Sequence, residues 1–120
     1  NNLKIPNFSM FVGSELNLLE GLKLGCAGCI SATLNVNFFA RKVFDDFQNK
    51  KKQTFNERLC AIRKVFDKNN LISGLHSFMS IEDAKYKIVL PPLSLLTKEQ
   101  EKQMIDELKA LDFYPEKKAA

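Results

Sequence analysis

The chain has 120 residues, of which 45% are hydrophobic and 27% are charged, and its formal net charge is +4. This length suits one domain, and the apolar share excludes a globally disordered chain. The small basic excess lies partly in two lysine runs, at residues 50–52 and 117–118. Such runs are more typical of solvated helix ends than of a nucleic-acid surface, which needs basic residues among exposed aromatics.

The sequence also argues against a membrane protein or a secreted protein. No apolar run reaches the ~20 residues that a membrane span needs, and no signal peptide is visible. The three cysteines are an odd number and too sparse for a disulfide scaffold. We therefore expect a cytoplasmic protein that has neither a membrane nor a nucleic acid as its partner.

Two short apolar runs predict a strand–helix–strand unit near the start of the chain. Residues 8–12 indicate a buried strand, and residues 26–33 indicate a second one. Between them, Ser14 is a good N-cap for a helix that carries Leu16, Leu18, Leu19 and Leu22, and Gly25 lies where a C-cap glycine belongs. Such a compact unit predicts two neighbouring parallel strands.

The rest of the chain is predicted to be helical. The expected helices cover residues 38–48, residues from the capping box at 54–57 to Asn69-Asn70, residues 71–80, and residues from a second capping box at 97–100 to Leu111. Residues 88–96 contain Pro91-Pro92 and predict an extended connector, and the tail from Tyr114 is expected to fray. The apolar stripe of Phe55, Leu59, Ile62 and Phe66 is predicted to be core or subunit interface.

Two parallel strands do not make a complete sheet, because each has two ladders and two apolar faces to satisfy. The expected helices cover part of that surface but supply no neighbouring strands. The chain is therefore expected to be the end of a larger α/β protein, or one half of an assembly that completes the sheet.

Cys26 and Cys29 have a spacing that zinc and redox sites use. On a strand, residues three apart point to opposite faces, whereas zinc ligands converge from a turn. A redox cysteine needs a helix N-terminus, and Cys26 follows a helix C-terminus. We therefore expect small core residues here and no metal site.

Three segments resemble the N-acetylneuraminate lyase / dihydrodipicolinate synthase family. They are Val12-Gly13-Ser14-Glu15 before a leucine-rich helix, the stretch from Leu24 to Val36 with its Gly-x-x-Gly-x-Ile-Ser-x-x-x-Asn pattern, and Leu90-Pro91-Pro92-Leu93 with the residues to Thr97. The family consists of Schiff-base-forming lyases and aldolases built on a TIM barrel. Together the three segments extend the resemblance over nearly the whole chain.

The resemblance implies an α/β fold, the C-terminal part of a TIM (β/α)8 barrel. Residues 1–50 would form the last two β/α units, with strands seven and eight, and residues 51–120 would form a C-terminal helical extension. A whole barrel needs roughly 250 residues. The Schiff-base lysine of the family lies on the sixth strand, outside this chain, so no catalytic residue is expected here and the chain alone is expected to be inactive.

The resemblance also indicates where substrates would bind. Sites of TIM barrels lie at the C-terminal ends of the strands. Ile30 would lie beside pyruvate, with its backbone carbonyl turned toward it, and Gly13 would let the backbone approach the ligand. Ser14 and Glu15 would lie near the second substrate, an aldehyde or semialdehyde. No cofactor is implied, and the family suggests a homo-oligomer, either a dimer or a tetramer.

Each of these residues also has a simpler structural interpretation. Ser14 can serve only as the helix N-cap, and Glu15 can serve as a favourable charge in the first helical turn. Asn35 is expected to organise the loop after strand eight rather than to touch substrate. His76, the only histidine, lies either on an ordinary helix face or at the mouth of the barrel.

Departures from the family pattern bear on the substrate. Leu16 and Ala32 replace polar residues of the sialic-acid lyases, and residues 70–76 lack the prolines and lysine common in dihydrodipicolinate synthases. The Gly13-Ser14 step resembles 2-keto-3-deoxygluconate aldolases. We therefore rank an unassigned or sugar-acid member first, dihydrodipicolinate synthase second and sialic-acid lyase third. The alternative is a non-catalytic, mostly helical interaction domain that completes its sheet with a partner.

Overall fold

The computed structural model describes residues 5–114, which fold as two compact units that divide between Cys60 and Ala61. In the first unit the elements are β1 (Phe11–Val12), η1 (Glu15–Asn17), α1 (Leu18–Lys23), β2 (Gly28–Cys29), η2 (Ala32–Asn35), α2 (Phe39–Gln48) and the start of α3 (Asn56–Phe66). The division lies inside α3, whereas we expected the barrel units to end at residue 50. That expected boundary stays a prediction.

The predicted pair of neighbouring parallel strands is confirmed. β1 pairs with β2 in parallel, with Phe11 opposite Gly28 and Val12 opposite Cys29. Flanking hydrogen bonds extend the pairing, from the Ala27 amide to the Met10 carbonyl at 2.7 Å and from the Ile30 amide to the Val12 carbonyl at 3.0 Å. Our prediction of a strand as far as Thr33 was wrong, because the chain turns into the 3₁₀ helix η2 at Ala32.

The register gives the strand pair one covered and one bare face. Val12 and Cys29, which lie opposite each other, pack against the helical core. Phe11 and Gly28 alternate to the other face, where the Phe11 ring lies 3.5 Å from the position of a Cβ on Gly28. Phe11 is 52% exposed and Ile30 is 72% exposed. We expected both faces of the strand pair to be buried, but in the described residues only the face toward α1 is.

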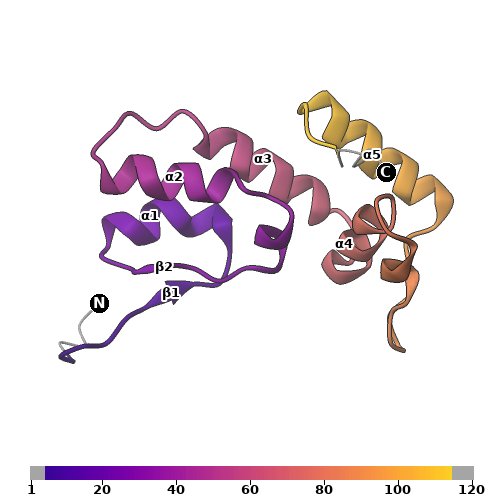
Figure 1. The fold of residues 1–120 in the computed structure, drawn as a ribbon, viewed down its shortest axis with the longest axis horizontal. Helices are drawn as coiled ribbons and strands as arrows, with labels where there is room; N and C mark the ends of the chain where they lie inside the picture. Colours follow the sequence, from indigo (N-terminus) through magenta and orange to yellow (C-terminus); the bar gives the residue numbers. More distant parts are fainter. Residues whose placement is uncertain (1–4, 115–120) are drawn as a thin grey trace. The chain divides into compact units, whose positions relative to one another are not determined.

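α1 lies between the strand pair and α2, as Figure 1 shows. Because the apolar residues of both helices recur at helical spacing, they meet in one core, which also takes in the first turns of α3. Its buried members are Leu18, Leu22, Ala40, Val43 and Leu59.

Local signals at both ends of α1 act as predicted. The Ser14 side chain accepts a hydrogen bond from the Leu16 amide at 3.4 Å, so Ser14 is the N-cap, although the first turn is the 3₁₀ helix η1. Gly25 has φ of 90°, a left-handed conformation that glycine adopts without steric cost. The chain therefore reverses at Gly25 and returns to β2.

The second unit contains the rest of α3, then α4 (Leu71–Met79), η3 (Ala84–Lys87) and α5 (Lys98–Ala110). The predicted helices match α4 and α5 within one or two residues, whereas α3 ends at Phe66, before the predicted end at Asn69-Asn70, and η3 was not predicted. Phe66 meets Phe78 edge-on at 5.5 Å between ring centroids, and Met104 and Leu108 of α5 are buried. Phe55 is half-buried, while Leu59, Ile62 and Phe66 are fully buried, so the predicted core role of this stripe is confirmed.

The predicted capping box of the last helix is confirmed. The Thr97 side chain accepts from the Gln100 amide at 3.2 Å, and the Gln100 side chain accepts from the Thr97 amide at 3.0 Å. The connector before it contains no helix or strand. It makes a turn at Pro91-Pro92, whose peptide bond is cis, closed by a hydrogen bond from the Leu93 amide to the Leu90 carbonyl at 3.0 Å, so the expected extended connector is interrupted there. Apart from Tyr114 itself, the tail that we expected to fray lies outside the described residues.

Among the helices of residues 5–114, none is long and apolar enough to cross a membrane.

Candidate functional site

The candidate site lies at the C-terminal edge of the strand pair. Because β1 and β2 are parallel, the chain leaves both strands at the same edge. The segment after β1 begins with Gly13 and leads into η1, and the segment after β2 begins with Ile30 and leads into η2. These two loops meet in one polar cluster, made by one residue of the first loop and two residues of the second.

Glu15, Ser31 and Thr33 form this cluster, which we call the Glu15 cluster. The Ser31 hydroxyl donates to Oε2 of Glu15 at 2.6 Å, and the Thr33 hydroxyl donates to Oε1. The two hydroxyl oxygens lie 3.2 Å apart. Glu15 and Thr33 are both 0% exposed. A buried carboxylate needs such donors, because burial removes the hydrogen bonds of water.

Local backbone structure explains how the cluster forms. Ser14 is extended, with φ of −141°, and caps η1, so Glu15 begins a tight turn beside the strand end. In the other loop Ser31 is also extended, with φ of −138°, and Thr33 follows inside η2. The hydrogen bond from the Ile30 amide to the Val12 carbonyl aligns the two loops. Residues 16 and 18 positions after Glu15 in the sequence therefore reach its carboxylate.

The structure separates the predicted site residues into two groups. Gly13 is exposed, with no atom within 4 Å of the position that a Cβ would occupy, and Ile30 is exposed beside it at the same strand edge. Ser14 is half-buried and caps η1. Glu15 was expected to approach the second substrate, yet in the described residues its carboxylate is buried against the loop after β2.

Asn35 makes a hydrogen bond within its own segment. Its side-chain amide donates to the Ala32 carbonyl at 2.8 Å, within η2. Ser31 and Thr33 were missed as site residues. The sequence contains both inside a run that we predicted as strand, and no periodicity marks a hydroxyl that pairs with a distant carboxylate.

The cysteine pair differs in detail from what was predicted. Cys26 lies before β2 and not in it, so strand alternation does not apply, and its Sγ lies 3.6 Å from the position that a Cβ on Gly21 of α1 would occupy. Cys29 packs on the core that α1 shares. The expectation of opposite faces was therefore wrong. Both cysteines are half-buried thiols, and the described residues contain no group of His, Cys, Asp and Glu that could hold a metal ion.

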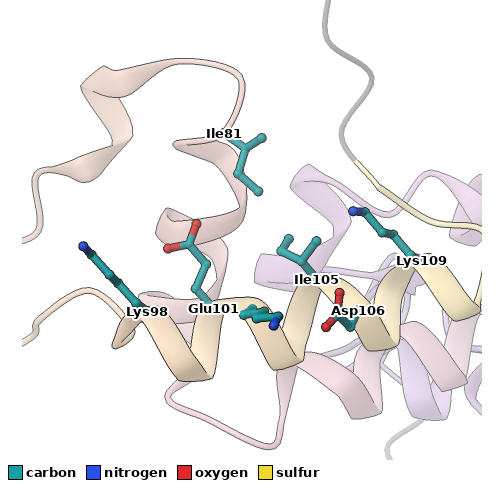
Figure 2. A pocket seen from close by; sticks show the side chains of 7 residues that line it. Ile81, Lys98, Glu101, Ile105, Asp106 and Lys109 are labelled. Carbon is teal, nitrogen blue, oxygen red and sulfur yellow. The ribbon is translucent and has the colours of Figure 1, made fainter.

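The second unit contains a shallow depression and the histidine. Ile81 faces α5 across the depression, which is bordered mainly by charged residues of α5 (Figure 2). Its lining consists of Ile81, Lys98, Glu101, Lys102, Ile105, Asp106 and Lys109. His76 lies on α4, where its Nδ1 is 2.8 Å from the Tyr86 carbonyl oxygen, so it links α4 to η3. This contact supports the structural interpretation of His76.

Comparison with known proteins gives one match. A sequence model of the dihydrodipicolinate synthetase family matches residues 2–111. No curated protein and no solved structure matches the chain. The match covers β1, α1, β2 and all of the later helices, including both loops of the candidate site. The chain therefore belongs to the dihydrodipicolinate synthetase family.

Proposed function

We propose that this chain is the C-terminal part of a Schiff-base-forming lyase or aldolase, which makes or breaks a carbon–carbon bond between pyruvate and an aldehyde. The family membership supports the pyruvate-dependent chemistry. The observation that carries the proposal is the parallel β1–α1–β2 unit, whose face opposite α1 is bare and whose sheet has only two strands in the described residues. A parallel pair of this kind needs neighbouring strands.

In this proposal β1 and β2 are strands seven and eight of a TIM barrel, residues 1–50 complete the barrel, and residues 51–120 extend it. The Schiff-base lysine is supplied from outside this chain, and the chain alone is inactive. The parent protein is cytoplasmic and assembles as a dimer or tetramer, in keeping with its family. No metal or other cofactor takes part.

The share of the site in this chain is Gly13, Ser14, Glu15 and Ile30, with Asn35 organising the loop after β2. The support is their location at the carboxyl edge of two parallel strands, where barrel sites lie. Exposed Gly13 and Ile30 border the ligand, with Ile30 beside pyruvate. Ser14 and Glu15 lie toward the second substrate, and Glu15 acts through its hydroxyl partners, as argued below.

For the reaction we rank cleavage of a 2-keto-3-deoxy sugar acid to pyruvate and an aldehyde, or an unassigned relative of that reaction, first. Condensation of pyruvate with a semialdehyde, the dihydrodipicolinate synthase type, is second. Leu16 is half-buried in η1, and its aliphatic side chain offers no hydrogen bond to a polyol. A sialic acid is therefore the third choice. Pyruvate release from a 2-keto-3-deoxy sugar acid and from a sialic acid, and consumption of pyruvate with the semialdehyde, are measured in the intact parent and rank the three reactions directly.

The test of the main proposal is reductive trapping in the intact parent protein. Condensation of the lysine amine with the pyruvate ketone releases water and leaves an imine, which borohydride reduces to a stable amine. We expect pyruvate-dependent mass gain on one lysine outside residues 1–120, and none on the isolated chain. A parent protein that gains no mass with pyruvate would contradict the proposal.

The alternative is an interaction domain without chemistry, since a sheet of two strands in the described residues also fits a partner that adds strands at its edges. Intact mass separates the two. A purified natural protein near the 13.7 kDa of this chain, with one cooperative unfolding transition, would favour the interaction domain. A longer parent protein with a trapped lysine favours the lyase.

A further inference from the structure

The Glu15 cluster joins the two loops of the candidate site by side chains alone. Glu15 belongs to the loop after β1, and Ser31 and Thr33 belong to the loop after β2. Ser31 follows Ile30 directly. The Ile30 amide donates to the Val12 carbonyl, and the hydroxyl of the next residue, Ser31, donates to Glu15. Ile30 is therefore restrained on both sides by hydrogen bonds to the segment that contains β1 and Glu15. The cluster therefore controls where the segment that carries Ile30 can lie.

The chemistry of the cluster makes this connection strong. A carboxylate is an acceptor that can receive both hydroxyl protons at once, and hydrogen bonds to a charged acceptor are shorter and stronger than neutral ones. Glu15 is fully buried, so water does not compete for these bonds. A glutamine of the same shape offers one acceptor oxygen, and the hydroxyl that faces its NH₂ group must turn round.

We propose that Glu15 is a positioning residue, whose buried carboxylate holds the loop after β2 through Ser31 and Thr33 and thereby sets the location of Ile30 at the pyruvate site. This inference rests on the proposed function for its pyruvate part. The connection between the two loops does not depend on that function and is measured separately, by hydrogen exchange.

The first measurement is hydrogen exchange in the protein that carries these residues. The amides of Val36 and Asn37 both donate to the Thr33 carbonyl, so they report on the loop after β2. Glu15→Gln is expected to speed their exchange by about tenfold to a hundredfold, the change that loss of one charged hydrogen bond corresponds to. Amides in α5 are expected to keep their rates. Unchanged exchange at residues 36 and 37 would overturn the inference.

The second measurement is the pyruvate concentration that gives half-maximal borohydride trapping in the intact parent. We expect Glu15→Gln and Thr33→Val each to raise it by about tenfold. In the double variant, Thr33→Val is expected to add less than about threefold, because its partner is already altered. If the increase in the double variant equals the product of the two single increases, Glu15 and Thr33 act separately and the inference fails.

Two control variants distinguish a positioning role of Glu15 from the loss of any carboxylate and from a general loss of stability. Glu20→Gln makes the same chemical change at an exposed side chain of α1, where Glu20 pairs with Lys23, and is expected to change neither readout. Thr97→Ala weakens the cap of α5 and is expected to lower stability while leaving half-maximal trapping unchanged. Should Glu15→Gln not fold, Ser31→Ala removes one hydroxyl of the cluster instead. A smaller rise in the exchange rates and in the pyruvate concentration for half-maximal trapping would support the inference, and no change in either would overturn it.

The two proposals fail in different ways. If the wild-type parent traps no pyruvate, the proposed function is wrong, while the exchange measurement still tests the cluster. If the parent traps pyruvate and Glu15→Gln leaves both readouts unchanged, the lyase assignment holds and the positioning role is wrong.

Discussion

Gly21 lies on the face of α1 that packs against β1, and it has no room for a side chain. A Cβ at this position would lie 2.5 Å from Cγ1 of Val12. Valine is stiff about χ1, so it cannot turn away easily. Gly21→Ala is expected to lower the free energy of unfolding by about 1–2 kcal/mol, because overpacking outweighs the gain of about 1 kcal/mol in helix propensity. Urea unfolding measures the change.

Two further variants make this prediction specific. Adding Val12→Ala to Gly21→Ala removes the close contact, so the double variant is expected to lose less than the sum of the two single losses. In α4, a Cβ on Gly74 would meet Met104 and Phe66 at 3.6 Å, which is ordinary contact. Gly74→Ala is therefore expected to be neutral or up to about 1 kcal/mol stabilising. A destabilised Gly74→Ala with an unaffected Gly21→Ala would contradict the packing argument.

At the scale of elements, the first turn of α5 depends on its capping box. Thr97 and Gln100 satisfy each other's backbone amides, which have no partner inside the helix. Thr97→Ala is expected to cost about 1 kcal/mol of stability, measured by thermal or urea unfolding. Thr97→Ser keeps the hydroxyl and is expected to retain most of the stability. Equal losses for alanine and serine would show that the hydroxyl is not what matters.

The ion pair of Lys68 with Glu107 connects the segment after α3 to α5 within the second unit. The hydrogen bond from Lys68 is the main reason why the pKa of Glu107 lies below its ordinary value of 4.5. A lowered pKa stabilises the fold above the ordinary value, and this contribution disappears as pH falls through the folded pKa. Stability is therefore expected to fall below about pH 4.5, in part through this pair.

Glu107→Gln tests that pH dependence. The variant is expected to lose less stability than the wild type between about pH 6 and about pH 3, and the difference should stay below about 1 kcal/mol because the pair is partly exposed. Urea midpoints across this range measure it. Parallel curves for the variant and the wild type would contradict the assignment.

At the scale of the whole molecule, the bare face of the strand pair is expected to behave differently alone and in a barrel. Phe8, Phe11 and Ile30 are each more than half exposed. Apolar strands with open edges associate. The isolated chain is therefore expected to self-associate in size-exclusion chromatography, and Phe11→Lys is expected to reduce this. In the intact parent the same substitution is expected to cost about 3 kcal/mol or more, because the ring would be buried.

Ile72→Lys is the matched control, since Ile72 of α4 is 47% exposed and lies in the second unit. It is expected to change neither association nor stability by a comparable amount. A parent protein that tolerates lysine at position 11 would place this face in solvent and would weigh against a barrel.

The sequence by itself determined the order of the two strands and of the α-helices, and the family. Helix signals act over three or four residues, so Ser14, Gly25 and the Thr97 box marked helix ends that the structure confirms. The strand–helix–strand order of residues 8–33 was enough to predict two parallel strands, because a helix between two neighbouring strands returns the chain to the edge where the first strand began. The family match agrees with the resemblance seen in the same residues.

Only the tertiary structure decided where the strands end and what Glu15 contacts. Residues 32–35 form a 3₁₀ helix inside a run that had the composition of a strand, and Cys26 lies outside β2. The partners of Glu15 lie 16 and 18 residues away, and no periodicity connects a carboxylate with two distant hydroxyls. The pairing of β1 with β2 brings them together, and burial then makes the hydrogen bonds necessary.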